Sequence, residues 1–514
     1  MEIKKITDTN ICEIKDKNII IYVKATECIS QMDSKYGIAN QITAIIEDFE
    51  HRRKACQING KMVEAYDSSY LYNVDWTETA LVILSDYYWE IFNKLNADEL
   101  LTSKLDVVYR FSSGDTNMYE YYYDKYSDFP LELSMVFRCG PKSEVKDKLW
   151  EYTDNTRAIF EYLVKEKYDR KYNLYFFVNN PEWVKAHNNY ISENVVLIDE
   201  AWAKSTSAEE QEQYYRALCL SKYIFFDHED TFARIARKEQ IKVQLWHGQG
   251  FKGRAISTSM KTRCTYMPVM SELYASIHKK IFDLEQNQMV ITGIPKQDWV
   301  FNKVKEETID ILKIPKADKY LFWLPTWRKV KWTDDIEIGI QNAECETNLP
   351  IFNKVSQLKD LNETLRKNNV CMLIKGHPEQ RIMIGDNQFS NIILVDCDLM
   401  ADYHIHINEL LNMADGLISD YSSVITDYLL LNRPICLAID DVKEYQESRG
   451  FVFEPICEWL PGKIAITKEE MIEFVEEIGR GIDSSKEKRE KIAQKICEFH
   501  DANNCRRLVE VLDI

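Results

Sequence analysis

Residues 416–427 read GLISDYSSVITD, a short apolar strand that breaks at Ser419 and runs into a helix beginning near Ser422. A buried strand followed directly by a helix is the repeating unit of parallel α/β sheets, so this stretch predicts that class of fold. The helix start also leaves backbone N–H groups free beside Ser422 and Ser423, where the helix dipole favours an anion such as pyrophosphate. An ordinary Ser or Asp helix cap is the alternative interpretation.

The same strand–helix alternation extends on both sides of this stretch. Strands are predicted in one set at 174–178, 195–198, 223–226 and 243–245, and in a second set at 289–292, 320–324, 371–374, 392–395, 416–418 and 434–438. Strands separated by helical segments form parallel sheets with helices on both faces. Two such sets predict an α/β fold of two Rossmann-like lobes, with ligands bound between them beyond the strand ends.

The first 130 residues predict a smaller α/β domain. Strands at 18–23, 42–46 and 80–85 follow the order of a dinucleotide-binding half, with acids at 47–48 after the second strand. The loop at 24–28, KATEC, lacks the glycines that let a backbone approach pyrophosphate. We therefore expect a small degenerate Rossmann-like N-terminal domain that binds no cofactor.

Two further segments fall outside the predicted sheets. The tyrosine-rich stretch 119–126 is interpreted as a linker or an edge element, whose aromatic rings pack between domains or form a recognition surface. The segment from about 468 to 511 predicts one charged, amphipathic helix that packs back across the lobes. The domain boundaries expected from this organisation are 1–130, 140–285, 286–480 and 481–514.

Composition narrows the function classes. A chain of 514 residues is too long for a single hydrophobic core, so several domains are expected. The net charge of −18 argues against a nucleic-acid partner, because binding to the phosphate backbone requires a basic surface. The thirteen cysteines include no C-x-x-C pair, so we predict neither a zinc site nor a disulfide framework. We expect the protein to reside in the reducing cytoplasm. No apolar run approaches the length of a membrane span, so at most a peripheral membrane association is expected.

The first segment with chemical promise is QLWHGQGFK at 244–252. A histidine followed by glycines just after a strand is exposed on a loop, and His247 would accept a proton from a substrate hydroxyl at neutral pH. Lys252 would contact a phosphate. Taken alone, a histidine in a turn is more often structural.

Two more segments place cations after predicted strands. TGIPKQD at 292–298 carries Lys296 at the tip of a Gly-Pro turn, which on its own is a generic turn. LPTWRK at 324–329 offers a hydroxyl, Thr326, and Arg328, which suits a bidentate phosphate contact, whereas Trp327 would serve packing.

The fourth segment, KGHP at 375–378, holds a second histidine, His377, between glycine and proline, and the fifth is the Ser-Ser helix start. Together the five segments bring two histidines, several cations and a hydroxyl pair to strand ends of two facing lobes. That combination suits transfer from a nucleotide-linked diphosphate donor, in which the diphosphate is neutralised and an acceptor hydroxyl is activated.

Two acid-and-histidine clusters are discounted. Asp396, Asp398, Asp402, His404 and His406 include metal-ligand residue types, but the alternation at 404–406 is more typical of a surface strand or turn. The cluster at 227–230, DHED, is interpreted as a helix cap. No metal is predicted.

The five segments resemble the CDP-glycerol:poly(glycerophosphate) glycerophosphotransferase family over roughly residues 145–480. The resemblance is carried by WHG at 246–248, GIPKQD at 293–298, PTWR at 325–328, KGHP at 375–378 and SDYSS at 419–423. It implies a glycosyltransferase-B fold with an acceptor lobe at 140–285 and a CDP-donor lobe at 286–480. It also implies metal-independent transfer of glycerol phosphate from CDP-glycerol, with release of CMP, in teichoic-acid or capsular polymer synthesis.

The resemblance assigns roles to matching positions. His247 is similar to the general base that deprotonates the acceptor hydroxyl, and His377 to a second essential histidine near the donor phosphates. Ser422, Ser423 and Asp427 match donor-holding positions, the last through ribose or glycerol hydroxyls. The remaining substrate-binding positions that we predict are Trp246, Gly248, Gln249, Gly250, Lys252, Lys296, Thr326, Trp327, Arg328, Lys375 and Gly376.

Two departures leave the donor open. Gln249 and Gly250 stand where the family usually has Thr-Pro, and Lys296 stands where an arginine is typical. CDP-ribitol or another CDP-polyol is therefore an alternative donor, with a lipid-linked or polymeric polyol or glycan as acceptor at the inner membrane leaflet. A nucleotide-sugar glycosyltransferase of the same fold and a non-catalytic scaffold of polymer assembly are the competing functions.

Overall fold

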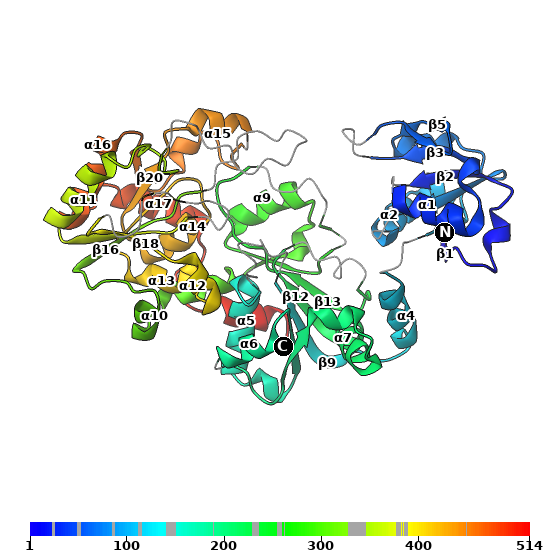
Figure 1. The fold of residues 1–514 in the computed structure, drawn as a ribbon, viewed down its shortest axis with the longest axis horizontal. Helices are drawn as coiled ribbons and strands as arrows, with labels where there is room; N and C mark the ends of the chain where they lie inside the picture. The colour runs from blue at the N-terminus through cyan, green and yellow to red at the C-terminus, as the bar shows by residue number, and fades with distance from the viewer. Residues whose placement is uncertain are drawn as a thin grey trace. The chain divides into compact units, whose positions relative to one another are not determined.

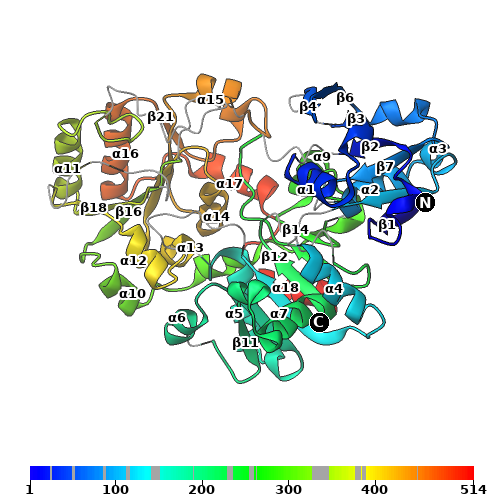
Figure 2. The ribbon, with the colours of Figure 1, turned by 45° about the vertical axis from the view of Figure 1, so that its right-hand side comes forward.

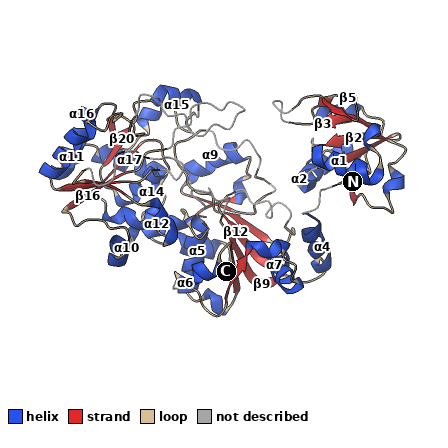
Figure 3. Cartoon of the chain, viewed as in Figure 1, coloured by secondary structure: helices blue, strands red, loops and turns tan. Residues whose placement is uncertain are grey.

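The computed structural model describes residues 1–22, 26–48, 53–84, 88–111, 116–139, 151–188, 190–228, 236–253, 260–261, 263–326, 346–376, 382, 384, 389–448 and 450–514. These residues form two compact units (Figure 1). The first unit contains Met1–Pro130, Ala203–Leu220 and Thr231–Lys238, and the second unit contains the remainder. Both units alternate helices with strands, as Figure 3 shows.

The first unit is built on a parallel six-stranded sheet in the order β1-β8-β7-β2-β3-β6. Along β2, Ile19 and Ile21 enter one core cluster while Ile20 and Tyr22 enter the other, so the sheet is buried on both faces. The strands are β1 (Glu2–Lys5), β2 (Asn18–Tyr22), β3 (Ile42–Ile46), β6 (Ala65–Tyr66), β7 (Thr79–Ile83) and β8 (Val107–Arg110), with a hairpin of β4 (Cys56–Ile58) and β5 (Lys61–Val63). The helices are α1 (Thr26–Tyr36), α2 (Tyr88–Asn96), α3 (Glu99–Thr102), α4 (Thr116–Tyr126) and α7 (Ala208–Leu220).

The acid after β3 is engaged by protein groups. Asp48 accepts a 2.5 Å hydrogen bond from the Tyr22 hydroxyl and pairs with Lys94 at 2.6 Å. Its second carboxylate oxygen accepts the backbone N–H of Ser68. In this unit the acid therefore joins neighbouring segments of the protein.

The prediction that 119–126 is a linker or edge element is wrong, because these residues form α4. Tyr119, Tyr122 and Tyr126 recur at helical spacing and are buried on one face, where Tyr122 stacks on Tyr215 of α7 with ring centroids 4.9 Å apart. Tyrosines at intervening positions, such as the exposed Tyr121, hid this period in the sequence.

The first lobe of the second unit has a parallel five-stranded sheet in the order β11-β10-β9-β12-β13. Its strands are β9 (Glu132–Arg138), β10 (Asn173–Val178), β11 (Val195–Asp199), β12 (Ser221–Phe226) and β13 (Ile241–Gln244), and its helices include α5 (Asp154–Lys165) and α6 (Pro181–Ala186). The central strand β9 precedes residue 140, where this lobe was expected to begin. β9 was not predicted because it directly follows the stretch that was interpreted as a linker.

A short βαβ unit follows the first sheet. β14 (Met267–Val269) and β15 (Met289–Ile291) pair in parallel across α9 (Glu272–Phe282), and a bridge between Val243 and Tyr266 places β14 beside β13. The prediction that 289–292 opens the second sheet is therefore wrong. β14 reads Met-Pro-Val, which is too short and proline-interrupted to be recognised as the partner of β15.

The second lobe has a parallel six-stranded sheet in the order β18-β17-β16-β19-β20-β21. Its strands are β16 (Lys319–Trp323), β17 (Val370–Ile374), β18 (Ile392–Leu394), β19 (Gly416–Ser419), β20 (Ile435–Ala438) and β21 (Lys463–Ala465). Its helices include α10 (Glu306–Ile311), α11 (Gln357–Lys367), α12 (Cys397–Asp402), α13 (Ile407–Leu410), α14 (Val424–Tyr428) and α15 (Val442–Ser448). The α/β fold with two Rossmann-like lobes is thus confirmed.

The predicted single helix at 468–511 is three helices: α16 (Lys468–Arg480), α17 (Lys486–Ile496) and α18 (Asn504–Val511). Gly481 ends α16 in the left-handed conformation, with φ at 71°. α16 lies beside α11 in the second lobe (Figure 2), whereas Cys505 and Leu508 of α18 enter the core of the first lobe. Among the described helices, none has the length and apolar character needed to cross a bilayer.

Candidate functional site

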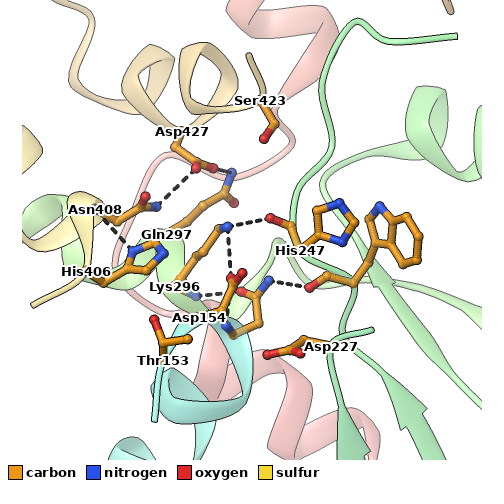
Figure 4. A network of polar contacts seen from close by, with 12 residues as sticks. Thr153, Asp154, Asp227, His247, Lys296, Gln297, His406, Asn408, Ser423 and Asp427 are labelled. Carbon is orange, nitrogen blue, oxygen red and sulfur yellow. Dashed lines mark hydrogen bonds and ion pairs between the residues drawn. The ribbon is translucent and has the colours of Figure 1, made fainter. Parts of the chain in front are cut away.

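Loops from the two lobes meet at the carboxyl ends of their strands (Figure 4). The loop after β13 carries His247, and a turn of 3-10 helix at Pro295–Phe301 carries Lys296. The second lobe contributes α14 and the start of α13. The polar residues drawn together here are Asp154, Asp227, His247, Lys296, Gln297, His406, Asn408, Ser423 and Asp427.

The His247 loop leaves β13 through a constrained turn. Trp246 adopts a left-handed conformation with φ at 53°, which is unfavourable for a bulky side chain and has to be held by neighbours. The Trp246 N–H donates to the Gln244 side chain at 2.8 Å, and its carbonyl accepts the Asn155 amide at 2.7 Å. These two bonds fix the direction in which His247 leaves the strand.

Two glycines let this loop touch the start of α14. A Cβ on Gly248 would lie 2.5 Å from the Ser423 hydroxyl oxygen, and one on Gly250 would lie 2.9 Å from the Ser423 Cα. The backbone of the loop therefore approaches Ser423, the N-cap residue of α14, more closely than any side chain would allow. The Ser-Ser pair thus stands directly beside the His247 loop.

Gln249 faces the protein interior. Its amide donates to the Pro268 carbonyl at 2.9 Å and accepts the Met270 N–H at 2.9 Å, while its own carbonyl accepts the Thr426 hydroxyl at 2.7 Å. We predicted that Gln249 contacts the substrate. In the structure its side chain is buried and ties the loop to β14 and α14.

Lys296 is buried beneath the loop. Its Nζ donates to the His247 carbonyl at 2.6 Å and pairs with the Asp154 carboxylate at 2.9 Å, and its backbone N–H donates to the Asn155 side chain. Burial alone would lower the pKa of Lys296, but the carboxylates of Asp154 and Asp427 raise it, so the ammonium stays charged. The predicted phosphate cation is therefore placed as a brace for the loop.

Asp427 is also engaged inside the protein. Its two carboxylate oxygens accept the side-chain amides of Gln297, at 3.0 Å, and Asn408, at 3.1 Å. Burial raises the pKa of Asp427 above its usual value. This carboxylate, predicted to hold donor hydroxyls, connects the Lys296 turn to α13.

The interpretation of 404–406 as a surface strand or turn is right about the turn at His404 but wrong about its exposure. His404 is buried and packs edge-on against Tyr152 and Trp183. His406 caps α13, because its Nδ1 accepts the Asn408 N–H at 3.2 Å. Burial and nearby Lys296 lower the pKa of His406 to about 3, which keeps this nitrogen free to accept. Within the described residues, no group of three or more His, Cys, Asp or Glu side chains has metal-binding geometry.

The segment at 227–228 also belongs to the site, which the helix-cap interpretation missed. The His228 Nδ1 lies 2.7 Å from Asp227, whose other oxygen accepts the Thr156 hydroxyl at 2.8 Å. The His228 ring stacks on His247, with centroids 4.8 Å apart and planes 16° from parallel. The cap itself would involve residues 229–235, which lie outside the described residues. An acid and a histidine directly after a predicted strand neighbouring that of His247 were the available signal.

His247 itself keeps a solvent-accessible residue position, while the rings of His228 and Trp246 pack against its imidazole. Shielding from water, followed by the positive charges of His228, Lys296 and Lys252, lowers the pKa of this imidazole below its usual value. His247 is thus neutral at physiological pH and has a ring nitrogen that can accept a proton.

Other predicted residues surround these. Thr326, after β16, donates its N–H to Asp420 at 2.8 Å and also bonds Asp420 through its hydroxyl, while Ser422 accepts the Val424 N–H. Lys375 and Gly376 follow β17, and Lys252 forms a backbone bridge with Phe451. His377, Trp327 and Arg328 lie outside the described residues.

Comparison with known proteins finds one matching family model and several similar curated proteins. Residues 146–513 match the family model described as CDP-glycerol:poly(glycerophosphate) glycerophosphotransferase. The chain is 27% identical over 311 residues to the teichoic acid ribitol-phosphate polymerase TarL of Staphylococcus aureus, covering 56% of this chain and 51% of that protein. It is 28% identical over 256 residues to the teichoic acid glycerol-phosphate primase of Bacillus subtilis, covering 47% of this chain and 60% of that protein.

The matched region spans about half the length of the first of these relatives. A solved structure of the wall teichoic acid polymerase TagF superposes with a TM-score of 0.58 at 19% identity, covering 78% of this chain and 93% of that one. This likeness shows the shared fold.

Proposed function

This chain belongs to the CDP-glycerol:poly(glycerophosphate) glycerophosphotransferase family, and we propose that it transfers a polyol phosphate from a CDP-alcohol to an acceptor hydroxyl. The observation that carries the proposal is a neutral, accessible His247 held at the facing strand ends of two lobes beside the Ser-Ser start of α14. A general base and hydroxyl donors at one position are what phosphoryl-type transfer from a diphosphate requires.

The reaction proceeds by displacement at the phosphorus that carries the polyol. The neutral imidazole of His247 takes the proton of the acceptor hydroxyl, and the oxygen forms a bond to that phosphorus. The bond from phosphorus to the bridging oxygen breaks, and CMP leaves with the electron pair. Ser422, Ser423 and Lys252 would donate to the phosphates, together with His377 and Arg328.

The buried residues support this chemistry from behind. Lys296 donates to the carbonyl of His247 and is itself paired with Asp154, while Asp427 accepts from Gln297 on the turn that carries Lys296. We assign these residues to positioning, and Lys375, Gly376, Thr326 and Trp327 to the donor pocket. No step in this mechanism uses a metal ion.

The polyol is glycerol or ribitol. The relatives include a polymerase named for ribitol phosphate and a primase named for glycerol phosphate, and a structure of TagF carries CDPG. The acceptor in this proposal is a lipid-linked or polymeric polyol or glycan at the inner face of the membrane, in teichoic-acid or capsular polymer synthesis. The N-terminal unit acts as an accessory domain.

The test is release of CMP from CDP-glycerol and from CDP-ribitol by the purified chain, with a soluble polyol acceptor and EDTA throughout. We expect release from one donor to disappear in His247→Ala and to persist in His500→Ala, which alters an exposed histidine of the C-terminal region. Turnover of a UDP- or CMP-sugar without release from any CDP-alcohol would replace the proposal with glycosyl transfer. A chain inactive toward every donor would point to a scaffold.

A further inference from the structure

Two histidines from neighbouring strands share one stack in the site. His228 lies just after β12 and His247 just after β13, and their ring centroids lie 4.8 Å apart with planes 16° from parallel. β12 and β13 are hydrogen-bonded neighbours, so the sheet itself sets this pairing. One side chain ties the two segments together, because Gln244 donates to the His228 carbonyl at 2.9 Å and accepts the Trp246 N–H at 2.8 Å.

The two rings have different partners. The Nδ1 of His228 lies 2.7 Å from a buried carboxylate oxygen of Asp227, and the other oxygen accepts the Thr156 hydroxyl. A carboxylate held in this way orients the imidazole and favours its protonated form. His247 has no such carboxylate partner among the described contacts, and the other charges that act on it are those of Asp154, Lys296 and Lys252.

The surroundings therefore separate the two protonation equilibria. Burial opposes the charge on His228, but the hydrogen bond and charge of Asp227 raise its pKa above the usual value. The pKa of His247 is lowered, with the charge of His228 contributing after the shielding from water. Titratable pairs whose environments move their pKa values apart divide acid and base roles between them.

We propose that His228 is a positioning residue for the transfer reaction: as a cation held by Asp227, it stacks on His247 and keeps that imidazole neutral and oriented as the base. This inference rests on the proposed function. It extends the working range of His247 to lower pH, because an uncharged base remains available where an isolated histidine would be half protonated.

The positive charge on His228 also affects the reaction after proton transfer to His247. When His247 takes the acceptor's proton, the stack carries two positive charges next to the anionic diphosphate of the donor. The repulsion between the rings then favours loss of that proton from His247 once the anionic product has left, which returns the base to its starting state.

The test is a histidine NMR titration of the full chain, with the His247 signal assigned through His247→Gln. In His228→Gln the cation is removed, so protonation of His247 is favoured and its pKa should rise by about one unit, a tenfold shift in the protonated fraction near pH 6. In His228→Lys a cation is restored without the ring, so the pKa of His247 should return toward the wild-type value. The side chain of His228 is 34% exposed, which makes both substitutions compatible with folding.

Asp227→Asn provides a second route to the same charge state. It leaves the ring in place but removes the carboxylate that favours the charged imidazole, so the pKa of His228 should fall and that of His247 should rise. The acid limb of kcat/KM for CMP release should move to higher pH in Asp227→Asn and His228→Gln by the same amount as the titration.

Either of two results would overturn the inference. One is an unchanged His247 titration in both Asp227→Asn and His228→Gln. The other is an activity loss of equal size at pH 6 and pH 8, which is the sign of a merely structural role. The titration needs no turnover. A chain that releases no CMP from any donor would refute the proposed function, and the NMR titration would still test the coupling between His228 and His247.

Discussion

The ammonium nitrogen of Lys296 lies 2.6 Å from the backbone carbonyl oxygen of His247 and donates a hydrogen bond to it. The two residues come from different loops, and the bond holds the base by its backbone, while the imidazole packs against the His228 ring. The cation at a position predicted to contact phosphate is thus bonded to the backbone of the loop.

Replacing Lys296 with methionine should destabilise the protein and abolish activity. The change removes the partner of the buried Asp154, and breaking a buried ion pair from one side costs about 3–5 kcal/mol. Urea unfolding and CMP release measure the two effects. Lys296→Arg, which keeps the charge, is the matched control and should retain more of both; equal losses in the two variants would argue against the brace.

The Asp154–Lys296 pair should make stability depend on pH in the acid range. Burial opposes the charge on Asp154, but Lys296 lowers its pKa, so the folded state favours the carboxylate. The contribution is present above the unfolded-state pKa of about 4 and is lost as pH falls through the lowered folded-state value. The difference in unfolding free energy between wild type and Asp154→Asn should therefore be constant from pH 5 to 7 and shrink below pH 4. A difference that grows on acidification would contradict the pairing.

Gly250→Ala should disrupt the contact between the His247 loop and α14. Its Cβ would lie 2.9 Å from the Ser423 Cα, and backbone atoms cannot rotate away. Overpacking of this kind costs about 1–3 kcal/mol and should displace the base. Thermal unfolding and CMP release are the measurements, and Ser423→Ala, which removes only the hydroxyl, separates the loss of space from the loss of a phosphate donor. Wild-type activity in Gly250→Ala would refute the close approach as a requirement.

Asp298→Ala should loosen the C-terminal helix. The two carboxylate oxygens accept the backbone N–H groups of Asn504 and Cys505, each at 2.9 Å, at the start of α18. Loss of such a cap costs about 1–2 kcal/mol. Hydrogen exchange should accelerate in α18 but not in α11, which lies in the second lobe. Uniform acceleration throughout the chain would show a global effect instead.

Much of the fold was predictable because its strands are buried on both faces. Such strands read as uninterrupted apolar runs, and β3 and β10 were placed within a residue of their observed ends. β14, by contrast, has no apolar run of its own and is recognisable only by its pairing with β15. The long amphipathic pattern after residue 468 concealed the stop at Gly481, since each of the three helices is amphipathic by itself.

The site was predictable only where a motif announces it. His247 and the Ser-Ser turn follow strands in glycine- or hydroxyl-rich contexts, and the structure brings them together. His228 and His406 lie beside them, but their places depend on strand order and on the start of α13, which no local pattern encodes. The engagement of Lys296 and Asp427 by internal partners is likewise a property of tertiary packing.

The path of the chain end also constrains how the second unit can move. The polypeptide passes from the first lobe to the second after β15 and returns to the first lobe between α16 and α18. The side chains of α18 then join the first-lobe core. The two crossings define one axis. Sliding or twisting one lobe on the other would stretch one of the crossings, whereas rotation about the line through both crossings stretches neither. A rotation about that line is therefore the movement of one lobe against the other that the two crossings leave unstrained.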